Sequence, residues 1–158
     1  FIEAITNDKL VGITKAETNK FCILVSAKGK GFVSETSLML TNQKKGKQIF
    51  NLKSSDVLVK VLDCNKNHLA SVNKSGKLLI IDIKNLPILQ KGGGVQIIKI
   101  KEDDALSDIQ LINLSEGLSW KTGSKIRNIT DIKFWIGKRA QSGKKVPKFF
   151  NKNLKFFD

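Results

Sequence analysis

The sequence predicts an all-β fold of the propeller type, built from repeated four-stranded blades, and three observations carry that prediction. A Gln-basic-Gly turn recurs at Gln43, Gln90 and Gln141, at separations of 47 and 51 residues. Apolar runs are short, rich in Val and Ile, and end at Gly, Asn, Ser or Lys turns. No segment has the length and periodicity of a long amphipathic helix. Self-similarity at about 40 to 50 residues is typical of propeller blades, each one supersecondary unit.

Two hairpins keep the repeat step in order along the chain. Residues 21–34 are expected to form the first hairpin, which turns at Gly29. Residues 68–81 are expected to form the second, which turns at Gly76, 47 residues later. Further strands are expected at 57–62, 78–83, 95–100 and 109–114.

Length and repeat phase define the domain organisation. The chain has 158 residues and 41% hydrophobic content, enough for a single domain, residues 1–158, with a real core. Residues 1–20 are expected to belong to an earlier repeat and residues 148–158 to form a C-terminal tail. Because Phe1 stands where an initiator Met would, we expect a fragment of a longer protein. Residues 104–109 and 131–136 each begin with Asp, a preferred helix cap, so each is either a helical turn or a loop.

Cysteine usage and apolar-run length bear on metal binding and location. Cys22 and Cys64 are isolated, with only His68 as a possible nitrogen ligand, so a zinc site lacks ligands and buried free thiols are expected. His68 begins a predicted strand and is expected to pack or to form hydrogen bonds. No apolar stretch reaches the roughly 18 residues of a membrane-spanning helix. We expect a cytoplasmic protein without a membrane partner.

Positive charge is concentrated in two segments of the chain. The formal net charge is +14, from 28 basic and 14 acidic residues. From residue 28 to 53, six lysines face a single acid, and from 121 to 158, eleven basic residues face two acids, while the other segments are balanced. An acidic loop between the two segments contains Glu102, Asp103, Asp104 and Asp108. Its charge predicts that it faces away from any phosphate backbone.

This surplus predicts nucleic-acid binding rather than only a solvated surface. A codon bias toward Lys would add lysines, but it would not remove acids. Lysines that neutralise phosphates release condensed counterions, which gives affinity without base reading. Arg, which contacts guanine edges in a bidentate manner, occurs only at Arg127 and Arg139. We expect sequence-neutral binding to duplex DNA through basic residues of the turns: Lys28, Lys30, Lys44, Lys45, Lys47, Lys91, Lys138, Arg139, Lys144, Lys145 and Lys148.

Aromatic residues near these lysines raise the alternative of single-strand binding, in which bases stack on aromatic rings. Phe32 and Phe50 match Leu79 and Ile98 in the next repeat, which predicts core positions for both. The tail contains Phe149, Phe150, Phe156 and Phe157. We expect these four to clamp the tail onto the domain, with base stacking as the second interpretation.

Catalysis is not expected from this chain. It contains no Tyr, and no Gly-rich loop carries the Lys-Ser/Thr ending of a phosphate-binding loop. The segment Gly92–Gly94 resembles such a loop only superficially, because the matching turns hold Lys in place of two of the glycines. We therefore expect no catalytic residue, no metal and no cofactor in this chain.

Several motifs together resemble a known family. They are Gly29-Lys30-Gly31-Phe32-Val33, Gly46-Lys47-Gln48, Leu86-Pro87-Ile88-Leu89-Gln90-Lys91-Gly92-Gly93-Gly94, Gly117-Leu118-Ser119-Trp120-Lys121, and Trp135-Ile136-Gly137-Lys138-Arg139-Ala140-Gln141-Ser142-Gly143 followed by Pro147. In this order they resemble the C-terminal domain of the bacterial DNA topoisomerase IV A subunit, within the gyrase A and topoisomerase IV A family. The resemblance covers essentially the whole chain.

The resemblance implies a β-pinwheel, a propeller-like domain whose blades exchange strands, with ring closure left open. It implies non-catalytic binding and bending of double-stranded DNA on behalf of an ATP-dependent type II topoisomerase that decatenates and relaxes DNA. The implied partners are the rest of the A subunit, together with the topoisomerase IV B subunit in a heterotetramer. ATP and Mg²⁺ would bind elsewhere in that enzyme, and the expected location is the cytoplasmic nucleoid.

Two alternatives remain open at this point. Gyrase carries a Gln-Arg-Arg-Gly-Gly-type box, whereas here Gln43-Lys44-Lys45-Gly46-Lys47 is followed by Gln48 in place of the final Gly. This degenerate box favours topoisomerase IV, and the alternative is the wrapping domain of the gyrase A subunit. A different class is a propeller that recognises an acidic protein partner, and salt-dependent binding to plain duplex DNA distinguishes the two.

Overall fold

The computed structural model describes residues 1–6 and 9–157, which form strands and short 3₁₀ helices. The strands are β1 (Ile2–Thr6), β2 (Lys9–Thr14), β3 (Phe21–Ser26), β4 (Lys30–Glu35), β5 (Leu58–Asp63), β6 (His68–Asn73), β7 (Lys77–Asp82), β8 (Val95–Gln96), β9 (Leu106–Ile112), β10 (Leu118–Thr122), β11 (Lys125–Ile129) and β12 (Lys144–Lys145). The 3₁₀ helices are η1 (Thr36–Met39), η2 (Ile83–Asn85), η3 (Leu114–Glu116) and η4 (Lys133–Trp135). These ranges contain no α-helix, so the all-β prediction is confirmed, and none of their helices has the length and apolar character needed to cross a membrane.

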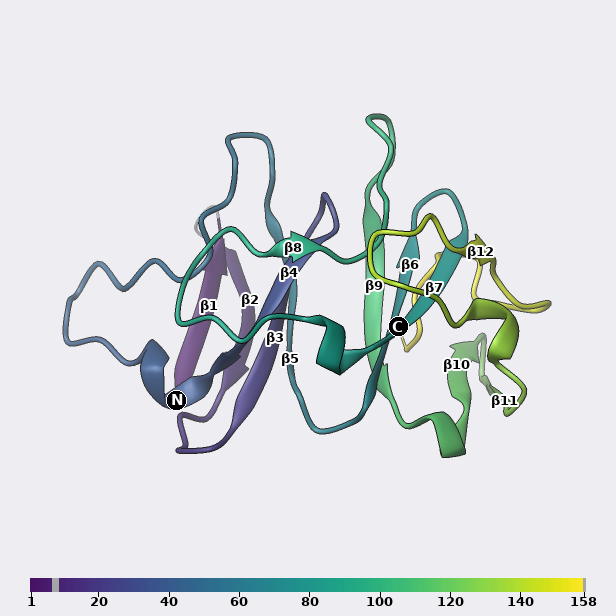
Figure 1. Cartoon of the computed structure of the whole chain (residues 1–158), viewed down its shortest axis with the longest axis horizontal. Coiled ribbons are helices and arrows are strands. Elements are labelled where there is room, and N and C mark those ends of the chain that lie inside the picture. The colour runs from purple at the N-terminus through teal and green to yellow at the C-terminus, as the bar shows by residue number, and fades with distance from the viewer. Residues whose placement is uncertain (7–8, 158) are drawn as a thin grey trace.

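The strands form two four-stranded sheets flanked by two hairpins (Figure 1). The first sheet has the order β5-β3-β4-β8 and the second the order β12-β7-β6-β9. The hairpin β1–β2 lies beside the first sheet, and the hairpin β10–β11 lies beside the second (Figure 1). The two sheets are successive copies of one blade, and the predicted repeat is therefore a structural repeat.

Each sheet obtains its fourth strand from the following repeat. Strand β8 comes after the second hairpin in sequence, yet it pairs with β4 of the first sheet, where Lys30 lies opposite Gln96. Strand β12 comes after the third hairpin and pairs with β7 of the second sheet, where Leu78 lies opposite Lys144. We call β8 and β12 the donor strands. Because of this exchange, each blade is complete only when the next repeat is present.

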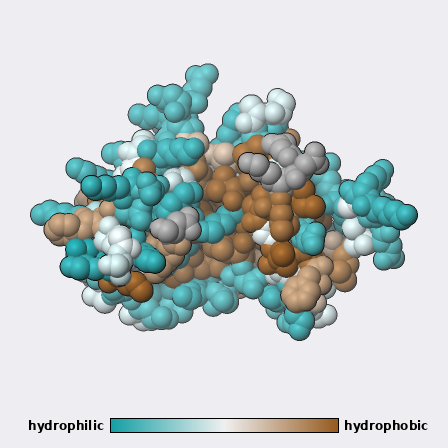
Figure 2. Space-filling view, turned by 180° about the vertical axis from the view of Figure 1, so that it is seen from behind, coloured by the Kyte–Doolittle hydropathy of each residue, from teal (hydrophilic) through white to brown (hydrophobic). Residues whose placement is uncertain are grey.

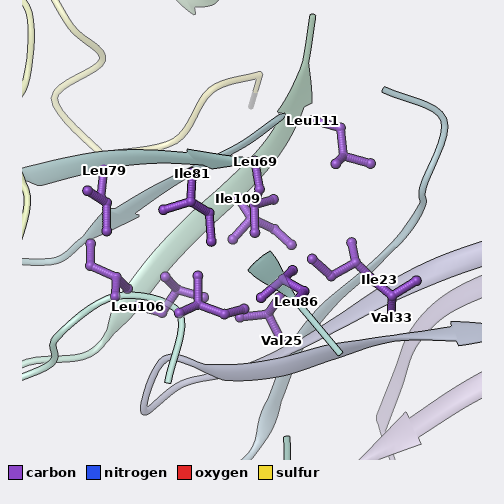
Figure 3. Close-up of a cluster of buried hydrophobic side chains, with 12 residues drawn as sticks. Ile23, Val25, Val33, Leu69, Leu79, Ile81, Leu86, Leu106, Ile109 and Leu111 are labelled. Carbon is purple, nitrogen blue, oxygen red and sulfur yellow. The ribbon is translucent and has the colours of Figure 1, made fainter. Parts of the chain in front are cut away.

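The main hydrophobic core lies between the two sheets (Figure 3). Figure 3 shows Ile23, Val25 and Val33 of the first sheet facing Leu79, Ile81 and Ile109 of the second. Successive side chains of a strand point to opposite faces, so the neighbouring residues pack on the outer faces of the two sheets. Both faces of β3 and β6 are buried. This explains the nearly continuous apolar sequence of β3, whereas β6 also buries the polar residues His68, Ser71 and Asn73.

The two outer faces carry separate clusters. Phe32 and Phe50 are buried in the cluster beneath β1 and β2, where their rings meet edge to face at 5.0 Å. Their predicted core positions are thus confirmed. Figure 2 shows, from behind, apolar side chains gathered on the half of the molecule that carries this hairpin, where Ile5, Leu10 and Ile13 are more than half exposed.

The opposite outer cluster confirms only half of the tail prediction. Phe150 and Phe156 are buried against Trp120 of β10, and the Lys121 amide donates a 2.6 Å hydrogen bond to the carbonyl of Phe156. These two rings clamp the tail as expected. Phe149 and Phe157 are instead exposed, by 69% and 46%.

Three segments differ from the sequence-based expectation. The strand predicted at 95–100 ends at Gln96. The Ile97 amide still donates to Gly29, next to β4, but the Lys99 amide donates to Gln141 of the last repeat, so pairing with β4 does not continue. Of residues 104–109, residues 106–109 already belong to β9, so no helical turn forms there. In residues 131–136 a 3₁₀ helix does form, but it follows Ile132 and has no side-chain cap.

Asp108 does not belong to the exposed acidic loop, contrary to the prediction. It lies in β9 with its side chain 4% exposed, and its carboxylate accepts hydrogen bonds from Lys60 at 2.8 Å and from the Phe156 amide at 2.9 Å. A buried carboxylate needs such partners. Asp108 therefore ties the first sheet, the second sheet and the tail together.

Candidate nucleic-acid interface

The basic residues predicted to bind DNA lie on the surface. Lys30 is half-buried, and the other ten are exposed. Most of them lie on three turns that are equivalent in the repeat: the first basic turn (residues 43–47), the middle turn (90–94) and the last basic turn (138–145). Gly46, Gly94 and Gly143 of these turns all have positive φ angles, of 84°, 71° and 74°. The common backbone shape supports the repeat that the Gln-basic-Gly pattern predicted.

The residues just after one basic turn form backbone hydrogen bonds with the next basic turn along the chain. After the first basic turn, Ile49 accepts from the Gly92 amide at 3.0 Å, and the Asn51 amide donates to Gly92 at 2.7 Å. After the middle turn, Ile97 accepts from the Ala140 amide and the Lys99 amide donates to Gln141, both at 2.9 Å. The three turns therefore follow one another along successive blades, and we call them together the basic strip.

The last basic turn is held by its own side chains as well. The Gln141 side-chain carbonyl accepts from the Lys138 amide at 2.9 Å, and the Arg139 guanidinium donates to the Gln96 carbonyl at 3.2 Å. The turn leads into donor strand β12. The cations at 138, 139, 144 and 145 are thereby presented from a fixed backbone.

The first basic turn has fewer contacts and extends to the left in Figure 1. Within it the Gly46 amide donates to Gln43, and the Lys47 ammonium donates to the Leu38 carbonyl at 2.9 Å. Residues 41–48 are all exposed. Lys44 and Lys45 have no hydrogen-bond or ion-pair partner among the described residues, so both charges are free to meet a ligand.

Lys28 and Lys30 lie on the β3–β4 turn rather than on the basic strip. The Lys28 amide donates to the Asp56 carboxylate at 3.0 Å, and its ammonium donates to Ser55. The nearby carboxylate offsets part of the Lys28 charge. Sequence reasoning did not reveal this neighbour, because 28 residues separate Lys28 from Asp56.

The acidic loop begins close to the last basic turn, since the Lys99 amide, three residues before Glu102, donates to the Gln141 carbonyl at 2.9 Å. Glu102 and Asp103 are exposed, and Asp104 accepts a hydrogen bond from Ser75 at 2.8 Å. In Figure 1 the segment between β8 and β9 projects upward as the tallest loop of the view. Its carboxylates would repel phosphate at the tip of this loop.

The cysteines offer no metal chemistry within the described part of the chain. Cys22 and Cys64 are free, and no group of three potential ligand side chains occurs among the described residues. Burial raises the pKa of Cys22 to about 12, and burial also raises the pKa of Cys64. His68 is buried at the start of β6 and its ring contacts the Asn67 side chain at 2.7 Å.

A second cluster of cations and aromatic rings was not assembled from the sequence. It lies between β11 and the tail, and it contains Arg127, Phe134, Trp135 and Phe149. Arg127 lies over the Phe149 ring at 4.5 Å from its centroid. The signal in the sequence was the mixture of Phe and Lys in the tail, but the partners from β11 and η4 are brought in only by the fold.

These features define the class of protein: a propeller-type domain whose blades exchange strands and whose edge carries a basic strip. The chain belongs to the DNA gyrase C-terminal domain family, a β-propeller family whose model matches residues 20–65 and 67–113. The two matched segments contain the two blade repeats, β3 to β5 and β6 to β9.

Sequence relatives lie on the topoisomerase IV side of this family. The chain is 34% identical over 152 residues to the DNA topoisomerase 4 A subunit of Rickettsia bellii, and 32% identical over 149 residues to that of Caulobacter vibrioides. The matches cover 96% and 94% of this chain, but only 20% and 19% of the relatives. The resemblance to the topoisomerase IV A subunit is confirmed, and the chain spans about a fifth of the length of these relatives.

Solved structures agree on the fold. The C-terminal domain of E. coli ParC superposes with a TM-score of 0.77 at 18% identity, covering 90% of this chain and 62% of that one. A C-terminal domain of DNA topoisomerase IV gives a TM-score of 0.69 at 23% identity, covering 87% of this chain and 44% of that one. Together with the family match, these similarities confirm the predicted propeller-like pinwheel.

Proposed function

We propose that this chain, as the DNA-contacting domain of a topoisomerase IV A subunit, binds duplex DNA along the basic strip. The observation that carries the proposal is the strip itself. Three equivalent turns, bonded one to the next, present exposed cations along successive blades. Lys dominates these cations, which supports contacts with phosphates rather than with base edges.

The strip also favours bending of the bound duplex. Its turns are distributed over successive blades, so a duplex that meets all of them has to follow the edge of the domain. DNA is stiff over such lengths, and the energy of bending must be supplied by the additional phosphate contacts. Bending by this domain would assist the parent enzyme in selecting crossed or supercoiled DNA.

The relatives suggest the context in which this domain acts. They are A subunits of topoisomerase 4, so we propose a parent enzyme that decatenates and relaxes DNA with a B subunit in a heterotetramer. ATP and Mg²⁺ would bind in other parts of that enzyme, in the cytoplasmic nucleoid. This chain has no Tyr with which to cleave DNA. A purified preparation should therefore neither nick nor relax a supercoiled plasmid.

The first experiment measures duplex affinity against salt concentration. If the strip neutralises several phosphates, the logarithm of the association constant should fall linearly with the logarithm of salt concentration, with a slope of about −0.9 per phosphate. Affinity should differ little between duplexes of unrelated sequence. A flat response to salt would contradict the proposal and favour the alternative of an acidic protein partner.

Charge reversal on the strip tests where the DNA lies. Changing Lys44, Lys45 and Lys47 to Glu, or separately Lys91, Lys138 and Arg139 to Glu, should weaken duplex binding by about tenfold or more. Each set should also reduce the magnitude of the salt slope by about 3. The matched control changes three exposed lysines outside the strip, Lys15, Lys66 and Lys84, to Glu. Equal losses in the control and the strip variants would show that only net charge matters.

A further inference from the structure

An open groove lies on the far side of the second sheet, between β11 and the tail. Its volume is about 910 Å³, and its walls include Trp120, Arg127, Phe134, Trp135, Lys148 and Phe149. Both tryptophans of the chain line it. It adjoins the basic strip at one end, because Lys145, the last residue of the last basic turn, lies in its wall, and Lys144 of the same turn lies over the Phe134 ring.

The groove lies beside β11, which has no donor strand among the described residues. Strands β4 and β7 are each covered by a donor strand, β8 and β12. Among the described residues, β11 pairs only with β10. The side of the third hairpin that is occupied in the two complete blades is therefore accessible here, and Ile126 of β11 is 70% exposed.

Two phenylalanine rings stand on fixed backbone at this groove. Phe149 has a positive φ of 63°, an unusual value for a bulky residue, and its carbonyl accepts a 3.0 Å hydrogen bond from the Trp120 indole. Phe134 packs edge to face with Trp135 at 5.2 Å, and the Trp135 indole donates to the Lys145 carbonyl at 2.8 Å. The rings nevertheless remain exposed, Phe134 by 57% and Phe149 by 69%.

Each exposed ring has a cation over one face, which leaves the opposite face for a ligand. The Lys144 ammonium lies 4.4 Å from the centroid of Phe134, and the Arg127 guanidinium carbon lies 4.5 Å from that of Phe149. Arg127 Nε is buried and has no hydrogen-bond acceptor among the described residues. Lys145 and Lys148 add charge to the walls, where Asp131 is the one acid among the lining residues that the structure describes.

We propose that this groove binds single-stranded DNA, with unpaired bases stacked on Phe134 and Phe149 and phosphates next to Arg127, Lys145 and Lys148. Exposed aromatic rings interleaved with cations are the arrangement that single strands use, since every base offers a flat face for stacking. In a duplex the bases are stacked on each other, so their faces are not available to stack on these rings. The cationic walls favour a polyanion over an apolar peptide strand.

This inference rests on the proposed duplex binding and extends it to single-stranded DNA. A duplex held along the basic strip and opened locally would place single-stranded DNA near the last basic turn. The groove would then retain the opened strand, while the strip retains the duplex. The two surfaces are therefore expected to respond to different substitutions.

The test uses the 158-residue chain and two fluorescein-labelled probes, a 12-nucleotide oligo(dT) and a 20-base-pair duplex. Oligo(dT) should bind and quench the fluorescence of the two groove tryptophans. The double variant Phe134→Ala with Phe149→Ala should lose about tenfold or more in oligo(dT) affinity while keeping its duplex affinity within about twofold. The control Phe157→Ala removes an exposed ring outside the groove and should change neither affinity.

The outcomes separate this inference from the function on which it rests. Duplex binding without tryptophan quenching by oligo(dT), or equal losses for both probes in the double variant, would overturn the groove as a single-strand site and leave the strip intact. Binding to neither probe would overturn the proposed DNA-binding function itself. The variant Phe134→Leu with Phe149→Leu keeps the apolar volume, so its loss of oligo(dT) binding without loss of thermal stability would attribute the effect to stacking.

Discussion

The first and last basic turns have equivalent sequences and backbone shapes, yet the structure holds them differently. A Cβ atom added to Gly143 would lie 2.6 Å from the Leu78 carbonyl oxygen, whereas one added to Gly46 would meet nothing within 4 Å. The difference arises because the last turn leads into donor strand β12, which pairs with β7. Residues 47 and 48, the equivalents of a donor strand after Gly46, pair with no strand in the described part of the chain.

The comparison shows that local sequence specifies the shape of a turn, but an acceptor hairpin specifies its position. The middle turn supports this view, since a Cβ atom on Gly94 would lie 2.8 Å from the carbonyl oxygen of Gly31 on β4. The backbone of β4 and β7 therefore lies in close contact with the glycine that precedes each donor strand. A turn docked in this way presents its cations at fixed points, whereas the first basic turn can adjust them to the DNA.

The largest expected effect is on stability, from alanine at these glycines. Gly143→Ala should destabilise the fold by about 3–4 kcal/mol, because it combines a positive φ with a backbone clash that only a shift of β12 can relieve. Gly46→Ala should cost only about 1 kcal/mol, from the positive φ alone. Urea unfolding curves measure both. Equal costs would show that the two turns are held alike, and Gly94→Ala should behave like Gly143→Ala.

The second effect concerns the anchoring of the last repeat through its tail. Asp108→Ala removes the acceptor of the Phe156 amide and of Lys60, so the tail and β5 lose a common partner. We expect a loss of about 2–3 kcal/mol in the free energy of unfolding and faster proteolysis of the tail. Asp104→Ala is the matched control, because its carboxylate bonds only to the turn residues Ser75 and Ala105. A tail that stays protected in the Asp108 variant would contradict this role.

Much of the fold could be predicted from the sequence, because the repeat marks equivalent positions. The hairpins at Gly29 and Gly76 and the core positions of Phe32 and Phe50 follow from a period of 47 or 48 residues. Strand exchange could not be derived in this way. It depends on which hairpin edge β8 and β12 reach, and a period is the same whether a strand pairs with its own repeat or with the preceding one.

The candidate site was predictable in charge but not in geometry. The lysine surplus identified the turns, yet hydrogen bonds between residues 49–51 and Gly92, and between 97–99 and 140–141, join them into one strip. Asp108 was misassigned because its acid neighbours in sequence suggested a common loop. Its partner Lys60 lies 48 residues away in the sequence, so neither this ion pair nor the burial of Asp108 leaves a local signal.

A smaller effect is expected from the glutamine of the last basic turn. Gln141→Ala removes the side chain that accepts from the Lys138 amide, so the last basic turn should loosen and stability should fall by about 1 kcal/mol. Duplex affinity should fall a few-fold, because Lys138 and Arg139 lose their fixed positions. Gln43→Ala should change neither quantity, since the described contacts of Gln43 are made by its backbone. Thermal melts and anisotropy titrations would test both, and equal effects at the two glutamines would contradict the comparison.

The smallest effect concerns the reactivity of Cys22, which tests whether the blade beneath the first basic turn is as accessible to solvent as the turn itself. Cys22 Sγ lies 3.9 Å from Met39 Sδ, and Met39 ends the helix η1 just before that turn. Burial raises the pKa of Cys22 to about 12, so only about one molecule in 10⁴ carries a thiolate at pH 8. Because the pKa of Cys22 is higher in the folded than in the unfolded state, the contribution of this thiol to the free energy of unfolding is fully present below pH 9. That contribution declines as the pH rises toward 12.

With a thiol reagent at pH 8, half-buried Cys64 should therefore react slowly and Cys22 only as fast as the protein unfolds. Replacing Gly46 with Ala should leave the Cys22 rate unchanged, because the turn is not docked on the sheet. Replacing Met39 with Ala should raise the rate several-fold, since it opens the side of the cluster that covers the sulfur. If Cys22 of the unchanged protein reacted as fast as Cys64, solvent would reach the core of the first blade. That result would contradict the inference that a tightly packed blade carries a weakly held turn.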